Sequence, residues 1–190
     1  MSRPQFWLVA GPNGAGKSTM SATIKKRFPS VQIIDPDYIA KDMTGSFSSV
    51  DQERIPAGRQ TLLLVKQHIE EGKSFVVEST ISGSSYIKYA KQARNVGFRT
   101  TLVYVGISSA KLSASRVSKR VSLGGHAIPT SDIERRHPRS LGNLEAHIKA
   151  FESAHIYDNS KRYQWVADYR EGIIHKTSQT APQWIKQYLP

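Results

Sequence analysis

The sequence contains no cysteine, which excludes disulfide bonds and metal sites built from thiolates. It has no apolar run of the roughly 20 residues that a transmembrane helix needs, so we expect no membrane contact. Residues 1–5 carry no signal-peptide pattern, and no linker, repeat or low-complexity tract interrupts the chain. These absences favour a cytoplasmic protein in which residues 1–190 form one domain.

Acidic residues are scarce beside basic ones. The chain has 27 Lys and Arg against 15 Asp and Glu, which gives a net charge of +12. A surface of this sign attracts nucleic acid or strongly anionic small molecules such as nucleotides, although it also serves solubility alone. The excess is concentrated between residues 111 and 139, where seven basic residues and two acids leave a local charge of 7 − 2 = +5.

Glycine is concentrated in one informative segment. Gly11–Ser18 fits the phosphate-binding pattern Gly-x-x-x-x-Gly-Lys-Ser/Thr, and it follows an apolar run and precedes a predicted helix. The backbone N–H groups of such a loop and of the helix start point at an anion. We expect Lys17 to contact the β- and γ-phosphates of ATP and the Ser18 hydroxyl to ligate Mg²⁺. The residues predicted to bind ATP are Gly11, Pro12, Asn13, Gly14, Ala15, Gly16, Lys17, Ser18 and Thr19.

Apolar runs alternate with helical patterns along the first two thirds of the chain. The predicted strands are 5–10, 31–34, 74–77 and 100–105, and the predicted helices are 17–27, 52–71, 84–95 and 109–121. This alternation predicts an α/β protein of the P-loop NTPase or kinase fold, with a mostly parallel sheet and helices on both faces. Ligands bind beyond the carboxyl ends of the strands in such sheets. The P-loop and the acids discussed next all lie at such ends.

Polar residues follow predicted strands two and three. Asp37 is our candidate for the base that takes a proton from an acceptor hydroxyl as the γ-phosphoryl group leaves ATP. Asp35 is an equally acidic alternative two residues away, and either residue is also a common helix cap. Glu78 follows the next strand, where it would hold Mg²⁺ or its waters, or bind substrate together with Thr80.

Basic residues flank a Gly-Gly loop at residues 124 and 125. Three precede the loop at spacings that place them on one helix face, and three follow it: Arg116, Lys119, Arg120, Arg135, Arg136 and Arg139. Arginines on a closing segment stabilise the charge of a transferring phosphoryl group, so we name residues 116–139 the predicted lid. We predict catalytic roles for Arg120, Arg116 and Arg136. A solvated basic face is the alternative, and we expect His126 to pack within the loop.

The pattern changes after residue 121. Ser131 and Glu134 have the spacing of a capping box, which predicts a helix start at Ser131, and Pro138 is expected to kink or restart that helix. A helical stripe predicts core packing by Leu141, Leu144, Ile148 and Phe151. The tail predicts a hairpin of strands 165–169 and 173–176, and then a short helix ending at Leu189.

Seven segments of the chain, taken in order, resemble the zeta-toxin family of P-loop kinases, especially its short single-domain bacterial members. They are Gly11–Thr19, Ile34–Asp37, Val77–Thr80, Arg116–Arg120, Gly124–Pro129, Ile133–Arg136 and Tyr157–Ser160. The resemblance implies a kinase that uses ATP and Mg²⁺. The best-known members phosphorylate a sugar hydroxyl of UDP-N-acetylglucosamine, act as toxins and are restrained by a small antitoxin protein.

The resemblance also implies roles for particular residues. It gives phosphate and Mg²⁺ binding to Lys17 and Ser18, and the role of the base to Asp37. It gives substrate contacts to Glu78 and Thr80. It gives phosphate contacts to Arg120 and to an arginine near Arg135 and Arg136.

Two other functions remain open on the sequence. The first is a kinase acting on a nucleic-acid hydroxyl, which the charge of +12 favours and the lack of an evident aromatic–basic cluster disfavours. The second is a module that binds ATP without chemistry, for example within a toxin–antitoxin pair. The arginines of the predicted lid and Asp37 favour a small-molecule kinase, because a passive binder needs neither.

Overall fold

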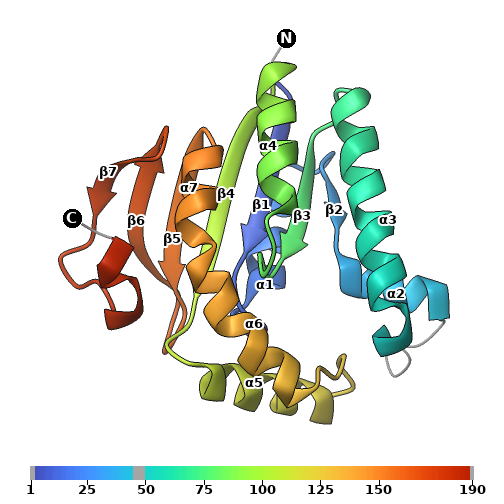
Figure 1. Ribbon diagram of the computed structural model, residues 1–190, viewed down its shortest axis with the longest axis vertical. Helices are drawn as coiled ribbons and strands as arrows, with labels where there is room; N and C mark the ends of the chain where they lie inside the picture. The colour runs from blue at the N-terminus through green and yellow to red at the C-terminus, as the bar shows by residue number, and fades with distance from the viewer. Residues whose placement is uncertain (1–2, 45–49, 189–190) are drawn as a thin grey trace.

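The computed structural model describes residues 3–44 and 50–188, which form a sheet flanked by helices (Figure 1). The strands in sheet order are β2, β3, β1, β4, β5, β6 and β7. The first five run parallel, β6 pairs antiparallel with β5, and β7 pairs antiparallel with β6. Their bounds are β1 (Gln5–Ala10), β2 (Gln32–Ile34), β3 (Phe75–Ser79), β4 (Arg99–Gly106), β5 (Ser153–Asp158), β6 (Gln164–Arg170) and β7 (Ile173–Thr177).

The helices cover the sheet unequally. Their bounds are α1 (Lys17–Arg27), α2 (Pro36–Thr44), α3 (Val50–Glu70), α4 (Ser85–Asn95), α5 (Ala110–Ser122), α6 (Thr130–Gly142), α7 (Leu144–Ala150) and the 3₁₀ helix η2 (Gln183–Tyr188). Figure 1 shows α3, α4 and α7 on the near face of the sheet and α1 behind it. Among the described residues, no helix combines the length and apolarity needed to cross a membrane.

The core lies mainly between the sheet and the three near helices. Phe6 and Leu8 of β1 face this side, with Phe75 of β3 stacked on Phe6 at 4.5 Å between ring centroids. A smaller cluster centred on Trp7 and Val9 lies on the other side, under α1. Because the central strands are buried on both faces, they appear in the sequence as continuous apolar runs.

Most of the predicted elements are present, and two that the sequence analysis did not predict are added. The predicted helix 52–71 corresponds to α3, and the C-terminal hairpin corresponds to β6 and β7. The fifth parallel strand, β5, and the helix α2 were not predicted. The end of the predicted C-terminal helix, at Leu189, lies outside the described residues.

The segment Asp35-Pro36-Asp37 starts a helix, as the helix-cap alternative of the sequence analysis expects. Strand β2 ends at Ile34 and α2 begins at Pro36. Proline suits the first helical position, because its missing N–H would be unpaired there. The Asp35 carboxylate accepts a hydrogen bond from the Asp37 backbone N–H at 2.9 Å, as a helix cap does. Asp35 therefore caps α2, and Asp37 lies in its first turn.

Helix α6 also departs from the prediction. It begins at Thr130, with Pro129 in the cap position and no side-chain cap, so Ser131 does not form the expected capping box. The helix runs through Pro138 to Gly142, and α7 starts only after that. An interior proline costs about 3 kcal/mol. Burial on both sides of it offsets the cost: His137 contacts the Ile107 carbonyl at 3.2 Å, and Ser140 lies 3.0 Å from the Tyr104 hydroxyl.

Close packing at the end of β4 gives a first testable prediction. A Cβ atom on Gly106 would lie 2.2 Å from the ring of Trp184, whose indole N–H donates to Asp158 at 2.8 Å. Gly106→Ala must displace this ring, so we expect a loss of about 1–3 kcal/mol of unfolding free energy. Gly142→Ala is the matched control, because nothing lies within 4 Å of a Cβ there. Urea unfolding of both variants measures the two free energies, and equal values would contradict close packing of Trp184 on Gly106.

Candidate active site

The P-loop connects β1 to α1, and close contacts make its glycines necessary. Gly11 has φ +141°, and a Cβ there would lie 2.0 Å from the Val105 carbonyl oxygen. Gly16 has φ +98°, and a Cβ there would lie 2.6 Å from the Tyr163 hydroxyl. Only glycine adopts these conformations in this space at no cost. The loop therefore keeps its curvature, which presents backbone N–H groups and the start of α1 to an anion.

Lys17 provides the cation of this loop. Its ammonium donates to the carbonyl oxygens of Gly11 and Pro12, each at 3.1 Å, which folds the side chain back over the loop. Burial lowers the pKa of Lys17, and the nearby carboxylates of Glu78 and Asp37 oppose that shift. A buried ammonium facing carboxylates is well placed to bind the phosphates of a nucleotide.

Ser18 and Glu78 meet beside the loop. Glu78 lies at the carboxyl end of β3, in register with Val9 of β1, and its side chain is buried. The Ser18 hydroxyl donates to the Glu78 carboxylate at 3.1 Å. Hydroxyl and carboxylate oxygens are the donors that Mg²⁺ prefers, so these residues fit that ion. Within 3–44 and 50–188, no three His, Asp or Glu residues form a metal-binding group.

The acids of α2 face the same space. Asp37 is 42% exposed at its side chain, and its carboxylate lies 3.9 Å from Nε2 of His126, which comes from the Gly-Gly loop. Burial, with the charges of Glu78 and Asp37, raises the pKa of Asp35 to about 7. The two acids thus differ: Asp35 is the half-buried cap of α2, and Asp37 reaches the solvent-facing side of the site.

The raised pKa of Asp35 predicts a pH-dependent stability. An acid whose pKa is higher in the folded state stabilises the fold below its unfolded pKa, near 4, and that contribution is lost as pH rises through about 7. Asn keeps the helix cap without the charge. We therefore expect Asp35→Asn to gain about 2–4 kcal/mol relative to the native protein between pH 4 and pH 8. Urea unfolding across this range tests it, and a difference independent of pH would contradict it.

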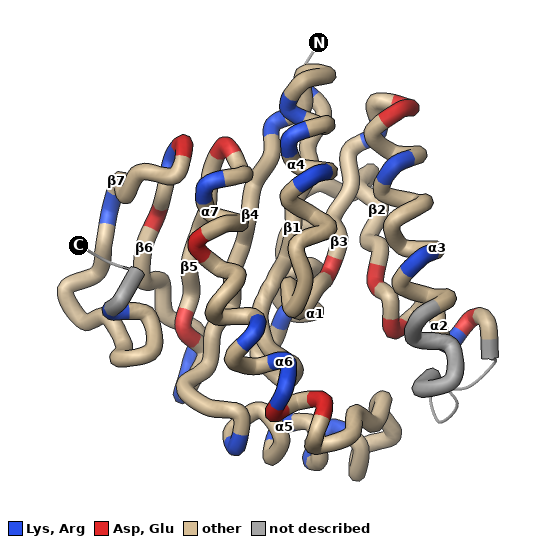
Figure 2. Tube along the Cα trace, in the orientation of Figure 1, with Lys and Arg blue, Asp and Glu red and all other residues tan. Residues whose placement is uncertain are grey.

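Helices α5 and α6 bring arginines to the side of the site opposite the acids at the ends of β2 and β3. Arg116 donates to the Ser160 carbonyl at 3.0 Å, and Arg120 to the His126 carbonyl at 3.0 Å. Arg136 pairs with Asp132 at 2.9 Å, and Arg135 pairs with the same carboxylate at 2.6 Å. Figure 2 shows the basic positions along α5 and α6 across from acidic positions at the ends of β2 and β3.

Most of these groups line one cavity of about 620 Å³. Of the residues singled out in the sequence, it is lined by Asn13, Gly14, Gly16, Lys17, Ser18, Thr19, Asp35, Asp37, Glu78, Thr80, Arg116, Arg120, His126 and Arg136. Gly11, Pro12 and Ala15 shape the loop behind it, and Arg135 and Arg139 lie outside its lining. Its volume is typical of sites for small ligands. The cavity combines cations for phosphates with carboxylates for a metal ion or a proton.

A segment not assigned a role from the sequence supports the P-loop from behind. The Asn159 side chain donates to the Ala15 carbonyl at 2.9 Å, and the Tyr163 hydroxyl donates to the Gly16 carbonyl. Ser160 supplies the carbonyl that Arg116 contacts. The period-two alternation of residues 153–158, ending in Asp-Asn-Ser, is the sequence signal that could have revealed both β5 and this loop.

Comparison with known proteins gives the following matches. The family model described as Zeta toxin matches residues 1–171. An "Uncharacterized protein" of Haemophilus influenzae is 34% identical over 149 residues, which cover 72% of this chain and 100% of that protein.

Solved structures share the fold. One comes from work on the PezAT chromosomal toxin–antitoxin system of Streptococcus pneumoniae. It is 22% identical to this chain, the match covers 88% of this chain and 72% of that chain, and the TM-score is 0.62. Another is shikimate kinase from Acinetobacter baumannii in complex with shikimate. It is 17% identical to this chain, the match covers 85% of each chain, and the TM-score is 0.53. The fold is therefore that of the P-loop kinases, as the strand–helix alternation predicts.

Proposed function

The chain belongs to the Zeta toxin family, and from this premise we propose that it is an ATP- and Mg²⁺-dependent kinase. The observation that carries the proposal is the single cavity in which Lys17, Asp37 and the arginines of α5 and α6 meet. Phosphoryl transfer needs positioning and electrostatic stabilisation more than covalent chemistry by the protein. A site with cations on one side and carboxylates on the other supplies both.

In this proposal the tasks of phosphoryl transfer are divided among the groups of the cavity. Lys17 and the P-loop N–H groups bind the β- and γ-phosphates. Ser18 and Glu78 hold Mg²⁺, which neutralises phosphate charge when bound. Asp37 takes the proton of the acceptor hydroxyl, and its exposure in the cavity leaves room for the acceptor. Glu78 and Thr80 also border the space where an acceptor would lie.

The predicted lid gives a third testable prediction. Arg120, Arg116 and Arg136 line the cavity, whereas Arg139 of the same segment does not. Because arginines stabilise the charge of the transferring group, we expect Arg120→Ala to lower kcat by about 10²–10³-fold. Arg139→Ala is the matched control, and its kcat should change less than threefold. Steady-state kinetics of both variants measures this, and equal losses would show that only overall charge matters.

We propose UDP-N-acetylglucosamine as the acceptor, by analogy with the best-known members of the family. The strong positive charge of the chain suits an acceptor that carries a diphosphate of its own. Incubation with ATP, Mg²⁺ and a panel of acceptors, followed by mass spectrometry, tests the choice. The proposal expects one added phosphoryl group on UDP-N-acetylglucosamine and none on uncharged sugars.

The charge of +12 also supports a second candidate, a kinase of nucleic-acid hydroxyls. Binding to a polyanion falls steeply with salt. An acceptor affinity that drops a thousandfold between 50 and 200 mM salt would therefore favour an oligonucleotide acceptor over a nucleotide sugar.

We also propose an antitoxin partner, a cytoplasmic location and a single domain, 1–190, with its lid at 116–139. The partner is suggested by family membership and by the toxin–antitoxin origin of the pneumococcal structure.

A further inference from the structure

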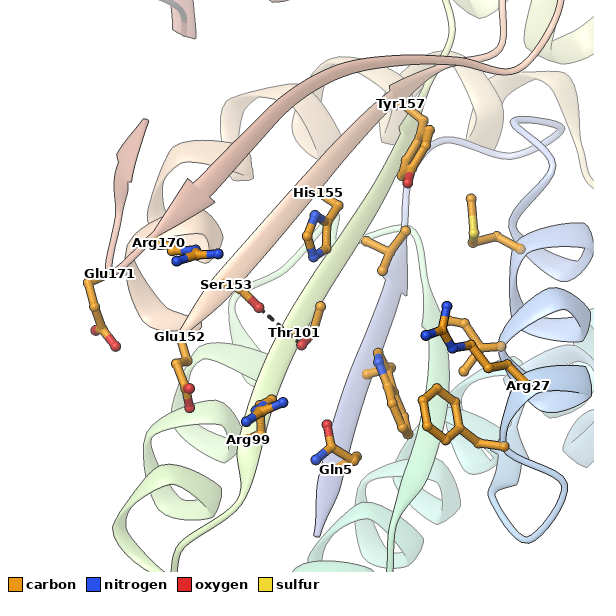
Figure 3. A pocket seen from close by; sticks show the side chains of 15 residues that line it. Gln5, Arg27, Arg99, Thr101, Glu152, Ser153, His155, Tyr157, Arg170 and Glu171 are labelled. Carbon is orange, nitrogen blue, oxygen red and sulfur yellow. Dashed lines mark hydrogen bonds between the residues drawn. The ribbon is translucent and has the colours of Figure 1, made fainter. Parts of the chain in front are cut away.

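The sheet face that carries α1 has a second cavity, which shares no lining residue with the candidate active site. Parallel sheets are normally covered by helices on both faces. Here α1 covers the strip around Trp7 and Val9, where Met20 and Ile24 pack. Beyond α1, a groove of about 740 Å³ lies over β4 and β5 and reaches the end of β6. We call it the α1–β6 groove (Figure 3).

The floor of the α1–β6 groove is formed by alternate residues of neighbouring strands. Thr101 of β4 lies in register with Ser153 of β5, and Val103 with His155. Three polar groups of the floor already have partners: the Thr101 and Ser153 hydroxyls are 3.1 Å apart, and His155 lies 2.7 Å from Asp168 of β6. An occupant therefore finds these groups already bonded, and the lining residues Met20, Ile24 and Phe28 offer it apolar contact.

The rim of the groove carries three arginines, and the Arg27 guanidinium lies over the Phe28 ring, 5.9 Å from its centroid. Figure 3 shows Arg27 of α1, Arg99 of β4 and Arg170 of β6 around the groove. Across residues 3–44 and 50–188, none of these three side chains makes an ion pair or hydrogen bond.

The two acids of the lining are already neutralised by arginines outside it. Glu152 pairs with Arg3 at 2.9 Å, and Glu171 pairs with Arg94 at 2.6 Å. The groove thus presents the guanidinium groups of Arg99 and Arg170, with that of Arg27 over the Phe28 ring, and both carboxylates of its lining are paired. Arg99 and Arg170 belong to the end of the groove where β4 begins and β6 ends. An occupant with acidic groups at this end and apolar groups along its length would be complementary.

We propose that the α1–β6 groove docks an amphipathic helix of a partner protein, with acidic residues at its end nearest Arg99. The floor from Ser153 to Tyr157 is about 13 Å long at 3.3 Å per residue. That length matches about nine helical residues at 1.5 Å each. A polynucleotide fits less well, because it binds by stacking on open aromatic faces. Trp7 is only 8% exposed, and the more exposed ring of the lining, Phe28, packs on Trp7 at 4.9 Å and has the Arg27 guanidinium over it, so no row of open rings is offered to successive bases.

The test uses a defined probe, a fluorescein-labelled 14-residue peptide with leucines three and four residues apart and three glutamates in its first turn. Fluorescence anisotropy measures its binding to the whole protein. We expect saturable binding that weakens at least tenfold in the combined variant R27Q/R99Q/R170Q. The same loss is expected when the three glutamates of the peptide are changed to glutamine. All three arginines are exposed, so these substitutions spare the core.

A charge-matched variant, R59Q/K88Q/K91Q, removes the same charge from exposed positions of α3 and α4 and should keep peptide binding within twofold. Equal weakening in both variants, or no saturable binding, overturns the proposal. The proposal is also overturned if a twelve-nucleotide oligouridylate binds more tightly than the peptide and this binding depends on the groove arginines, because the groove would then be a nucleic-acid surface. A dimer in sedimentation that R27Q/R99Q/R170Q dissociates would assign the groove to a second copy. ATP binding should be unchanged in both variants, which separates this inference from the proposed kinase activity.

Discussion

Lys17→Ala is expected to lower phosphoryl transfer at least about a hundredfold without unfolding the protein. The ammonium is the only cation of the P-loop sequence Gly11–Thr19, and the proposed mechanism uses it to bind the β- and γ-phosphates. Stability should not fall, because the buried ammonium carries a desolvation cost that lowers its pKa. Kinetics with saturating ATP, together with thermal unfolding of both proteins, measures the two effects separately.

The matched control for this prediction is Lys26→Ala. Lys26 lies on the same helix, α1, and is exposed. Its loss removes the same charge from the protein while leaving the cavity intact. Activity that falls equally in Lys17→Ala and Lys26→Ala would mean that net charge, not the P-loop ammonium, supports turnover.

Asp37→Asn is expected to lower kcat by about 10²–10⁴-fold, the range that a positioned general base contributes. Asn has the size of Asp but cannot accept the acceptor's proton at neutral pH. The KM for ATP should change less than threefold, because Asp37 is proposed to act on the acceptor and not on the nucleotide. Initial rates with each substrate varied in turn measure both parameters.

Asp42→Asn is the control for Asp37→Asn, because Asp42 is an exposed acid of the same helix, α2. Its kcat should stay within twofold of the native value. If Asp37→Asn keeps full activity and Asp35→Asn loses it, the base is Asp35, and the cap of α2 has a chemical role as well as a structural one.

The parts of the fold that the sequence predicts are those encoded locally. The P-loop needs only the spacing of Gly11, Gly16 and Lys17, and the helices show their apolar faces within one window. Two elements cannot be predicted from local sequence alone. The first is β5: the segment 153–158 is short and only half of its residues are apolar, and it pairs with β4, whose residues lie about fifty positions earlier in the chain. Helix α2 is hidden because Asp35-Pro36-Asp37 resembles a turn until its cap is seen.

The site shows the same division. Arg116 and Arg120 are predictable as neighbours because they lie one turn apart on α5. Their contacts with Ser160 and His126 are not, since these depend on how distant segments pack. The approach of His126 to Asp37, at 3.9 Å, is likewise a tertiary contact between the Gly-Gly loop and α2. Local spacing therefore indicates which residues carry charge, and only the fold shows which of them share the cavity.

The most direct test of the account counts ADP and phosphorylated acceptor in the same reaction with ATP, Mg²⁺ and UDP-N-acetylglucosamine. The account predicts one phosphorylated acceptor per ADP, with both products lost in Lys17→Ala and Asp37→Asn. ADP formed without any phosphorylated acceptor, or ATP bound with no turnover across the acceptor panel, would contradict the claim that this cavity is a kinase site.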